Sequence, residues 1–462
     1  MPQAHWVLLS IRSSTNNAQD FHMNPGPWRR MMNWEVKYYP EFWNGKRLAY
    51  PHVSKESPKF ARSIVVGNLI FVSGCTGQDT IRGGPTADNF EDQMNMALEK
   101  VKMAMEEAGS SLENVVKTLM LIKHRDDYPR MRRTEVEFYM KHAPYLVEKP
   151  PASTFMVPAS LARPEFLIEM DVIGVVDREA PGWPLKFYPE FWAGKRLSFP
   201  HVPKESPKFA RTEAVGNMIV VSGCTGQNPE NLKVEAMDIE GQARIAFRKM
   251  IKGLEEAGGS LNNLVKTYVL LRDMKDLQKY RKVEREYFKW HAPDLLKNPP
   301  ASTAIQATSL ALPDFLIEVE AFAAISKGSP GWEVKSTKGG KEAAAGVSLG
   351  NLLFLSACEG SNPQTGRVDT NAVEEQVHLA LDKVKSSLET SGSSLDKVVK
   401  TFMLLKRLED YPKMRKAEVE YYEKHAPYLV ENPPVSTFMQ LSDLTRPGAL
   451  FEIDVTAVLE TP

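Results

Sequence analysis

The chain repeats one short sequence three times, and each repeat contains one of its three cysteines. The cysteines are 149 residues apart (75 to 224) and then 134 residues apart (224 to 358), and later landmarks recur with the same two spacings. The histidine of His-Ala-Pro is one such landmark, at 142, 291 and 425. A chain with this periodicity is expected to fold as three related copies of one module. The repeats are Ser73-Gly74-Cys75-Thr76-Gly77, Ser222-Gly223-Cys224-Thr225-Gly226 and Ser356-Ala357-Cys358-Glu359-Gly360.

Turn-forming sequences mark where each copy begins. Pro-Gly-Trp precedes the second and third copies, and its tryptophan aligns with Trp34 of the first. We therefore predict modules at 31–178, 179–327 and 328–462, after a mobile tail at 1–30 that is rich in Ser, Asn, Gln and Pro. The third copy is shorter by 15 residues (149 − 134) and lacks the Tyr-Pro-Glu-Phe-Trp found at 39–43 and 188–192.

Composition narrows the class of protein. The 462 residues carry 58 basic and 58 acidic side chains, which gives no general attraction to nucleic acid or to an anionic membrane. We found no apolar run of about 18 residues, so no membrane span is expected. An odd number of cysteines, one per copy, favours reduced thiols in a cytoplasmic protein over a disulfide framework. The histidines show no metal-ligand spacing, and no cofactor or metal is expected.

Hydrophobic periodicity predicts the order β-β-α-β-α-β-β within each copy. In the first copy two apolar runs, 62–66 and 69–73, flank Gly67-Asn68, which suits a tight hairpin turn. An apolar stripe over 94–105 predicts a helix that ends near Gly109. The remaining predicted elements are a strand at 115–122, a charged helix at 127–142, and strands at 152–157 and 166–176.

This order, the hairpin sequence Val-Gly-Asn-Leu-Ile-Phe-Val-Ser-Gly, the strand at 114–118 and the ending Leu167-Ile168-Glu169-Met170-Asp171 resemble the Rid family of reactive intermediate deaminases, also called YjgF-like or L-PSP proteins. The resemblance implies an α+β fold like that of Bacillus chorismate mutase, a mixed sheet with two helices on one face. Family members form homotrimers with ligand clefts between subunits. Three copies in one chain then predict an intramolecular pseudo-trimer that could remain monomeric as a chain.

The last predicted strand places two acids on one face, because side chains alternate along a strand. Such a face turns to water as often as it lines a site. In the family, the first acid of the pair lies in the cleft and serves hydrolysis of an imine or enamine. A carboxylate there can act as base towards water and return a proton to nitrogen, and burial would raise its pKa. The candidate catalytic residues are Glu169, Glu318 and Glu452.

The sequence departs from the family at two ligand-binding positions. Family deaminases carry an arginine in the penultimate strand that binds the substrate carboxylate, and here serine replaces it in every copy. A family tyrosine before the first hairpin is also replaced, by phenylalanine in two copies and by Ala343 in the third. The predicted cleft positions are Ser153, Ser302, Ser436, Phe60 and Phe209.

An arginine on the second helix of each copy could compensate, by binding an anion from the other wall of the cleft. The alternative is a solvated helix face salt-linked to Glu135, Glu284 and Glu418 at i, i+3. The arginines are Arg132, Arg281 and Arg415.

The cysteines and their neighbouring glycines are also expected at the cleft, since this stretch lines it in the family. Reactivity would require a base, such as the histidine of His-Ala-Pro, and the simpler interpretation is three small buried thiols. The positions are Gly74, Gly223, Cys75, Cys224 and Cys358.

Three functions fit these observations. The leading one is an altered imine or enamine hydrolase that acts on a small molecule in clefts between the modules. The second is a family homologue that binds a small metabolite without turning it over. A ribonuclease or translation inhibitor is the least favoured, because no basic, aromatic stretch is present. The shortened third copy also allows a division of labour, in which one cleft is structural.

Overall fold

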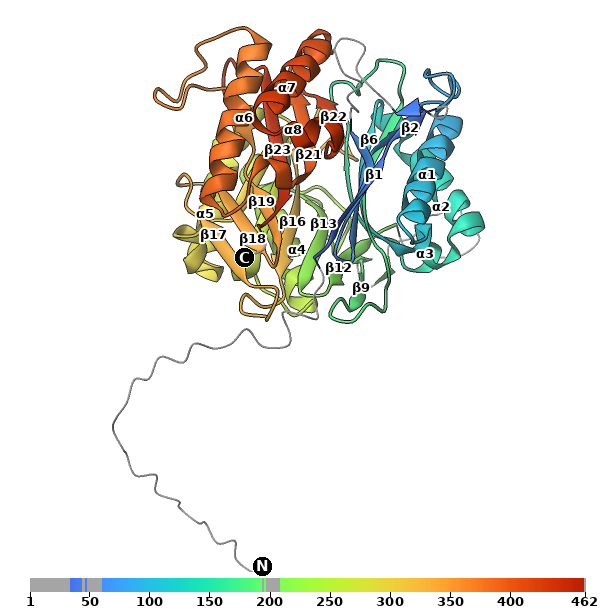
Figure 1. The fold of residues 1–462 in the computed structure, drawn as a ribbon. Coiled ribbons are helices and arrows are strands. Elements are labelled where there is room, and N and C mark those ends of the chain that lie inside the picture. Colours follow the sequence, from blue (N-terminus) through green and yellow to red (C-terminus); the bar gives the residue numbers. More distant parts are fainter. Residues whose placement is uncertain (1–33, 44–45, 48–59, 193–194, 197–207, 461–462) are drawn as a thin grey trace, which may run out of the picture.

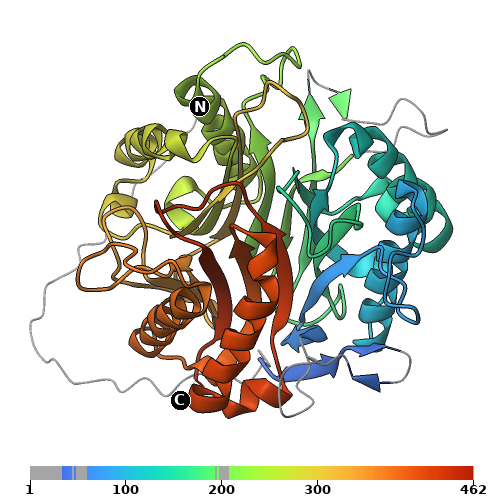
Figure 2. The same ribbon diagram turned by 90° about the horizontal axis from the view of Figure 1, so that it is seen from above.

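A computed structural model describes residues 34–43, 46–47, 60–192, 195–196 and 208–460, and the predicted tail at 1–30 lies outside these ranges. The chain has a mixed α/β fold with strands near the centre and helices towards the outside, as the view from above shows (Figures 1 and 2). No helix in the described ranges is long and apolar enough to cross a membrane.

The first copy contains the predicted order of elements with three additions. The hairpin of β4 and β5 turns at Gly67, whose φ of 62° only glycine adopts readily, so the predicted hairpin is confirmed. The additions are the strand β1 before the hairpin, the short pair β2 and β3, and the short helix α3. The bounds are β1 Val36–Pro40, β2 Phe42–Trp43, β3 Lys46–Arg47, β4 Ala61–Val66, β5 Leu69–Thr76, α1 Phe90–Glu107, β6 Val115–Ile122, α2 Tyr128–His142, α3 Pro144–Glu148, β7 Ala152–Met156 and β8 Ile168–Val175.

The second and third copies repeat the predicted order, but the second has a 3-10 turn in place of α3, and the third, among its described residues, lacks the short strand pair and divides the second hairpin strand into β19 and β20. In the second, the elements are β9 Leu185–Pro189, β10 Phe191–Trp192, β11 Lys195–Arg196, β12 Ala210–Val215, β13 Met218–Thr225, α4 Ile239–Glu256, β14 Leu264–Leu271, α5 Leu277–His291, β15 Ala301–Gln306 and β16 Ile317–Ala324. In the third, they are β17 Val334–Thr337, β18 Gly346–Leu349, β19 Leu352–Leu355, β20 Cys358–Glu359, α6 Val373–Thr390, β21 Val398–Leu405, α7 Tyr411–His425, α8 Pro427–Glu431, β22 Val435–Gln440 and β23 Phe451–Val458.

The last strand of each copy lies between the second strand of the hairpin and the strand that follows the first helix. In the first copy β8 pairs antiparallel with both β5 and β6, and β7 adds parallel to β6. Ile168, Met170 and Val172 of β8 pack under the helices, as the alternation predicts. Glu169 and Asp171 point to the other face, yet their exposed fractions are only 3% and 4%. The interpretation of this face as water-exposed is therefore wrong.

Backbone hydrogen bonds join the copies at three equivalent places. Ala210 N donates to Pro151 O at 3.1 Å, Ala344 N to Pro300 O at 3.2 Å, and Ala61 N to Pro434 O at 3.2 Å. The first copy thus contacts the second, the second contacts the third, and the third contacts the first. We call these contacts the first–second, second–third and third–first junctions.

Buried ion pairs follow the same cycle. Each joins the lysine of the Val-Lys-Thr strand in one copy to the second acid of the last strand in the next. Lys117 Nζ lies 2.8 Å from Glu320 Oε2, and both side chains are about 5% exposed. The equivalent pairs are Lys266 with Asp454 and Lys400 with Asp171. A charge buried without such a partner would carry a large desolvation cost.

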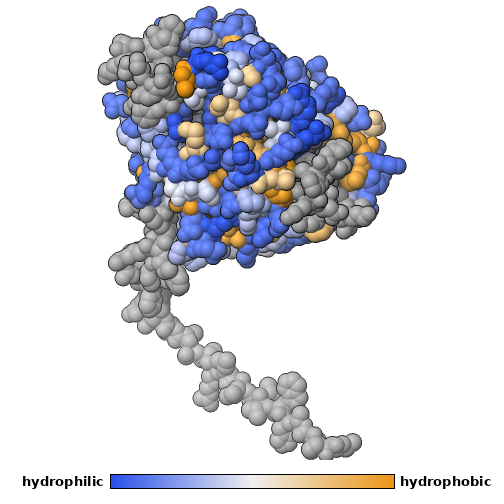
Figure 3. Space-filling model, turned by 90° about the vertical axis from the view of Figure 1, so that its right-hand side faces the viewer, coloured by the Kyte–Doolittle hydropathy of each residue, from blue (hydrophilic) through white to orange (hydrophobic). Residues whose placement is uncertain are grey.

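The tryptophans that open the copies meet one another. Trp34, Trp183 and Trp332 make three edge-to-face contacts, with ring centroids 4.9, 5.1 and 4.7 Å apart. This geometry suits the aromatic quadrupole and adds to the burial of the rings. The face in Figure 3 is mostly hydrophilic, with some apolar side chains between the polar ones.

Candidate functional site

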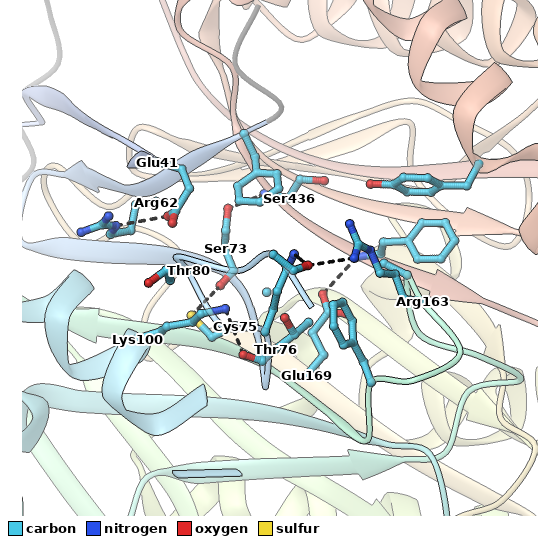
Figure 4. Close-up of a pocket in the computed structure, with 18 of the residues that line it drawn as sticks. Glu41, Arg62, Ser73, Cys75, Thr76, Thr80, Lys100, Arg163, Glu169 and Ser436 are labelled. Carbon is cyan, nitrogen blue, oxygen red and sulfur yellow. Dashed lines mark hydrogen bonds and ion pairs between the residues drawn. The ribbon is translucent and has the colours of Figure 1, made fainter. Parts of the chain in front are cut away.

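Two cavities lie at junctions between copies. The first, of about 430 Å³, lies at the third–first junction and is drawn in Figure 4. The second, of about 210 Å³, lies at the first–second junction. Four basic and two acidic side chains line each of them. In the first cavity these are Arg62, Lys100, Arg163, Arg415, Glu41 and Glu169. In the second they are Arg132, Lys208, Arg211, Lys249, Glu190 and Glu318.

Two of the three predicted catalytic glutamates line these cavities. Glu169 comes from β8, and its Oε1 accepts a hydrogen bond from Phe438 N of the neighbouring copy at 3.4 Å. Its Oε2 is buried without a hydrogen-bond partner among the described residues. Burial raises the pKa of Glu169 to about 8. Glu318 accepts from Phe155 N at 3.2 Å, and burial raises its pKa to about 7.

The predicted glycines make room for these carboxylates. The pairing of β5 with β8 shifts register between Val72 and Cys75, and Gly74 lies in this irregularity. A Cβ atom at Gly74 would lie 1.9 Å from Glu169 Oε1, and one at Gly223 would lie 1.8 Å from Glu318 Oε1. Both distances are far inside van der Waals contact, so only glycine fits beside the glutamate.

The helix arginines are buried and bridge a helix to a strand. Arg415 donates from Nη1 to Glu418 at 2.9 Å and from Nη2 to Ser436 Oγ at 3.1 Å, and only 3% of the residue is exposed. The predicted i, i+3 ion pairs are present, whereas the prediction that they lie on a solvated helix face is wrong, because the arginines are buried. The other two arginines repeat both contacts: Arg132 with Glu135 and Ser153, and Arg281 with Glu284 and Ser302.

The three predicted serines therefore each accept a hydrogen bond from the arginine of their own copy. Ser436 and Arg415 line the first cavity, and Ser153 and Arg132 line the second. Arg132 Nε is buried and has no hydrogen-bond partner among the described residues. The wall of each of these two cavities thus contains an arginine of the second helix hydrogen-bonded to a serine of the penultimate strand.

The segments upstream of the hairpins contribute residues that sequence reasoning missed. Glu41 of Tyr-Pro-Glu-Phe-Trp lines the first cavity and lies 3.1 Å from Arg62 Nε, and Glu190 and Arg211 repeat this pair in the second. The predicted Phe60 and Phe209 line the same two cavities. The sequence contains a signal for this pair, because the motif and the arginine occur together in the first two copies and are both absent from the third, which has Ala345 at the arginine position.

Helix α1 supplies a further missed residue. Lys100 lines the first cavity and donates to Thr76 O at 3.0 Å. Lys249 does the same in the second, donating to Thr225 O at 3.2 Å. Burial lowers the pKa of both lysines.

Cys75 lines the first cavity and Cys224 lines the second. Burial raises the pKa of Cys75, Cys224 and Cys358 to about 12, so they are thiols at neutral pH. His142 lies instead beside α1, stacked on Phe138 and 3.8 Å from Glu99. All three cysteines are free. Within the described ranges, no three His, Cys, Asp or Glu residues are placed to hold a metal ion.

The second–third junction is built differently. Ala357 takes the place of the glycine, and its N donates to Ser302 O of the second copy at 3.4 Å. Glu452 accepts from Thr445 Oγ1 at 2.9 Å within its own copy. The predicted residues at this junction are Ser302, Arg281, Cys358 and Glu452, and Glu359 of β20 pairs with Glu452 of β23. Burial raises the pKa of Glu452 to about 7.

Comparison with known proteins identifies the family. The family model described as Endoribonuclease L-PSP matches residues 54–176, 201–325 and 343–459. The chain therefore belongs to this family, the Rid or YjgF family, and contains three tandem copies of its domain.

Relatives of known name match one copy at a time. A RutC family protein of Pyrococcus abyssi is 36% identical over 121 residues, which are 26% of this chain and 89% of the relative. Reactive Intermediate Deaminase A of Arabidopsis thaliana is 34% identical over 24% of this chain and 56% of its own. The 2-iminobutanoate/2-iminopropanoate deaminase of Escherichia coli K12 is 32% identical over 17% of this chain and 62% of its own.

Two solved structures complete the comparison. E. coli TdcF with bound serine is 25% identical and aligns with 25% of this chain and 87% of its own, with a TM-score of 0.23. A chorismatase is 14% identical and aligns with 75% of this chain and 93% of its own, with a TM-score of 0.46.

Proposed function

We propose that the chain is a Rid-like hydrolase that deaminates a small imine or enamine in the two cavities. In this proposal the modules at 31–178, 179–327 and 328–462 form an intramolecular pseudo-trimer, and each cavity takes residues from two of them. The observation that carries the proposal is a buried glutamate in each cavity whose pKa, about 8 for Glu169 and about 7 for Glu318, lies near neutral pH. An acid with such a pKa can both give and take a proton.

The reaction converts an imine and water to a ketone and ammonia. Glu169 is protonated below about pH 8, so it donates its proton to the imine nitrogen first. Water then adds to the carbon, and the carboxylate takes a proton from that water. The carboxyl group then gives this proton to the amine nitrogen of the carbinolamine, the C–N bond breaks and ammonia leaves. The carboxylate takes the hydroxyl proton as the ketone forms, which restores the protonated acid. This order reverses the one expected from the sequence, in which the carboxylate acted first as base.

The cations of the cavity walls account for substrate binding in this proposal. Arg415 and Arg132 approach from the helix side and take over the role of the missing strand arginine towards a substrate carboxylate. Each is also paired with a glutamate, at 2.9 Å for Arg415 and 2.8 Å for Arg132. That pairing weakens the attraction for a second carboxylate, so the proposed affinity is lower than with an unpaired arginine.

The double variant Glu169→Gln with Glu318→Gln tests the proposal. Glutamine keeps the shape of the side chain and cannot shuttle the proton, so we expect release of the 2-oxo acid from 2-iminopropanoate, generated in situ, to fall by about 100-fold or more. Glu452→Gln is the matched control and should retain most of the turnover. Activity of the wild-type protein should fall as pH rises above about 8, because Glu169 then loses its proton.

A binding protein without turnover is the second candidate, favoured by the neutralisation of Arg415 and Arg132 by Glu418 and Glu135. If the wild-type protein binds small carboxylates but accelerates imine hydrolysis no more than the double glutamine variant, this second function replaces the first.

A further inference from the structure

At the second–third junction, the carboxylate of Glu359 is bound by two cations of its own copy. Glu359 Oε2 lies 2.9 Å from Lys383 Nζ, and its Oε1 accepts from Arg446 Nε at 2.7 Å. Ser361 adds hydrogen bonds from its N at 2.6 Å and its Oγ at 3.0 Å. These contacts lower the pKa of Glu359 to about 2, the opposite of the direction in which its burial acts. The site is a complete receptor for one carboxylate.

The first cavity contains a lysine and an arginine at the equivalent positions, and both donate hydrogen bonds to the equivalent backbone carbonyls. Lys100 and Arg163 occupy the positions of Lys383 and Arg446, 283 residues earlier in each case. Lys100 donates to the carbonyl of Thr76 at 3.0 Å, as Lys383 donates to that of Glu359 at 2.8 Å. Arg163 Nη1 donates to Gly83 O at 2.8 Å, and Arg446 Nη1 donates to the equivalent Gly366 O at 2.6 Å.

The first cavity has no counterpart of the Glu359 carboxylate, because the residue at the equivalent position is Thr76. Thr76, Lys100 and Arg163 all line this cavity, and in Figure 4 the two cations lie on either side of Thr76. An ammonium group can donate three hydrogen bonds and a guanidinium five, so groups of these two kinds can bind a carbonyl and a carboxylate together, as Lys383 and Arg446 do. The space that Glu359 fills at one junction is thus part of a cavity at another.

The second cavity keeps only one of the two cations. Lys249 is present, whereas Leu312 stands where Arg163 and Arg446 stand in the other copies. This cavity is also smaller, at about 210 Å³ against about 430 Å³. Both cavities are lined by four basic and two acidic side chains, but the second has Lys208 and no counterpart of Arg163. The two cavities therefore differ in where the basic groups lie and in size.

We propose that Lys100 and Arg163 form a second carboxylate-binding site in the first cavity, which makes this cavity selective for dicarboxylates. One carboxylate lies between Lys100 and Arg163, where the third copy holds its own glutamate. The other end of the ligand lies at Arg415 and Glu169, and this part rests on the proposed function. The second cavity takes ligands with one carboxylate. The substrate class of the first cavity is then an imine derived from an acidic, rather than an apolar, amino acid.

Calorimetric titration of the full chain with succinate and with butyrate tests this inference. Succinate should bind one site per chain and bind tighter than butyrate by about 10-fold or more, the range expected of charge-assisted hydrogen bonds to an additional carboxylate. Arg163→Leu, which copies the second cavity, should weaken succinate binding by about 10-fold and leave butyrate binding unchanged. Arg125→Leu is the matched control, since Arg125 is 37% exposed in the same copy and pairs with Asp126.

A second variant keeps the test informative if Arg163→Leu perturbs the loop. Thr76→Glu builds the internal carboxylate of the third copy into the first and should abolish succinate binding without lowering the melting temperature. The inference is overturned if succinate does not bind, or if Arg163→Leu changes its Kd by less than twofold. Succinate binding that responds to these variants in a chain that hydrolyses no imine would refute the proposed hydrolase while leaving this site intact.

Discussion

At the scale of single residues, the third–first and first–second junctions differ from the second–third junction by one methyl group beside the glutamate. Gly74 and Gly223 leave room for Glu169 and Glu318, whose Oε1 atoms lie 1.9 and 1.8 Å from where a Cβ would be. The third copy has Ala357 at this position, and Glu452 there accepts hydrogen bonds from Thr445. We infer that the alanine methyl excludes Glu452 from the position that the other two glutamates occupy.

This inference predicts the effect of Gly74→Ala combined with Gly223→Ala. Both glutamates must move out of the cavities, so imine hydrolysis should fall to the level of the double glutamine variant. Crowding in the core should also lower the free energy of unfolding by about 1–3 kcal/mol per site. Gly84→Ala is the control, because a Cβ there meets nothing within 4 Å. Turnover above half of the wild-type value in the double alanine variant would refute the role of these glycines.

At the scale of elements, local patterns predicted most of the fold and only part of the site. The hairpins, the helices and the last strand follow from periodicity and turn residues, which are properties of short segments. The strand β1 and the cavity position of Glu41 were missed, because Glu41 reaches its place only through pairing of β1 with β4 and contact with Arg62. The receptor for Glu359 was missed for the same reason, since Arg446 lies 87 residues away in the sequence.

The link between helix and strand gives a prediction at this scale. Arg415 and Arg132 each donate to a glutamate on their own helix and to a serine on the facing strand. Lysine carries the charge without the planar fork and cannot make both contacts in this geometry. Arg415→Lys with Arg132→Lys should weaken binding of 2-oxobutanoate, a ketone product analogue, by about 10-fold in calorimetry.

Arg281→Lys is the matched control for that experiment. Arg281 makes the same two contacts at the second–third junction, so the loss of stability per site should be similar while binding is unchanged. Equal losses of binding in the control and in the double variant would assign these arginines a purely structural role.

At the scale of the whole molecule, the buried ion pairs make each copy depend on the next. Lys117, Lys266 and Lys400 each pair with an acid of another copy, and the cycle closes because the third copy pairs with the first. The tryptophan contacts and the backbone hydrogen bonds at the junctions follow the same cycle. A defect at one junction should therefore lower the stability of all three copies. We expect the chain to unfold in a single transition.

Lys400→Met tests this dependence at the junction that closes the cycle. It leaves Asp171, whose side chain is 6% exposed, without its cation, and an uncompensated buried charge costs about 3–5 kcal/mol. Scanning calorimetry should then show a lower melting temperature and still one transition, because the first copy cannot stay folded without the third. Adding Asp171→Asn removes the stranded charge and should recover part of the loss. Lys416→Met breaks an exposed pair with Glu420 and should cost less than about 1 kcal/mol. Two separate transitions in Lys400→Met, or a loss no larger than that of Lys416→Met, would show that the copies are stable independently and that the ion pairs merely accompany their contact.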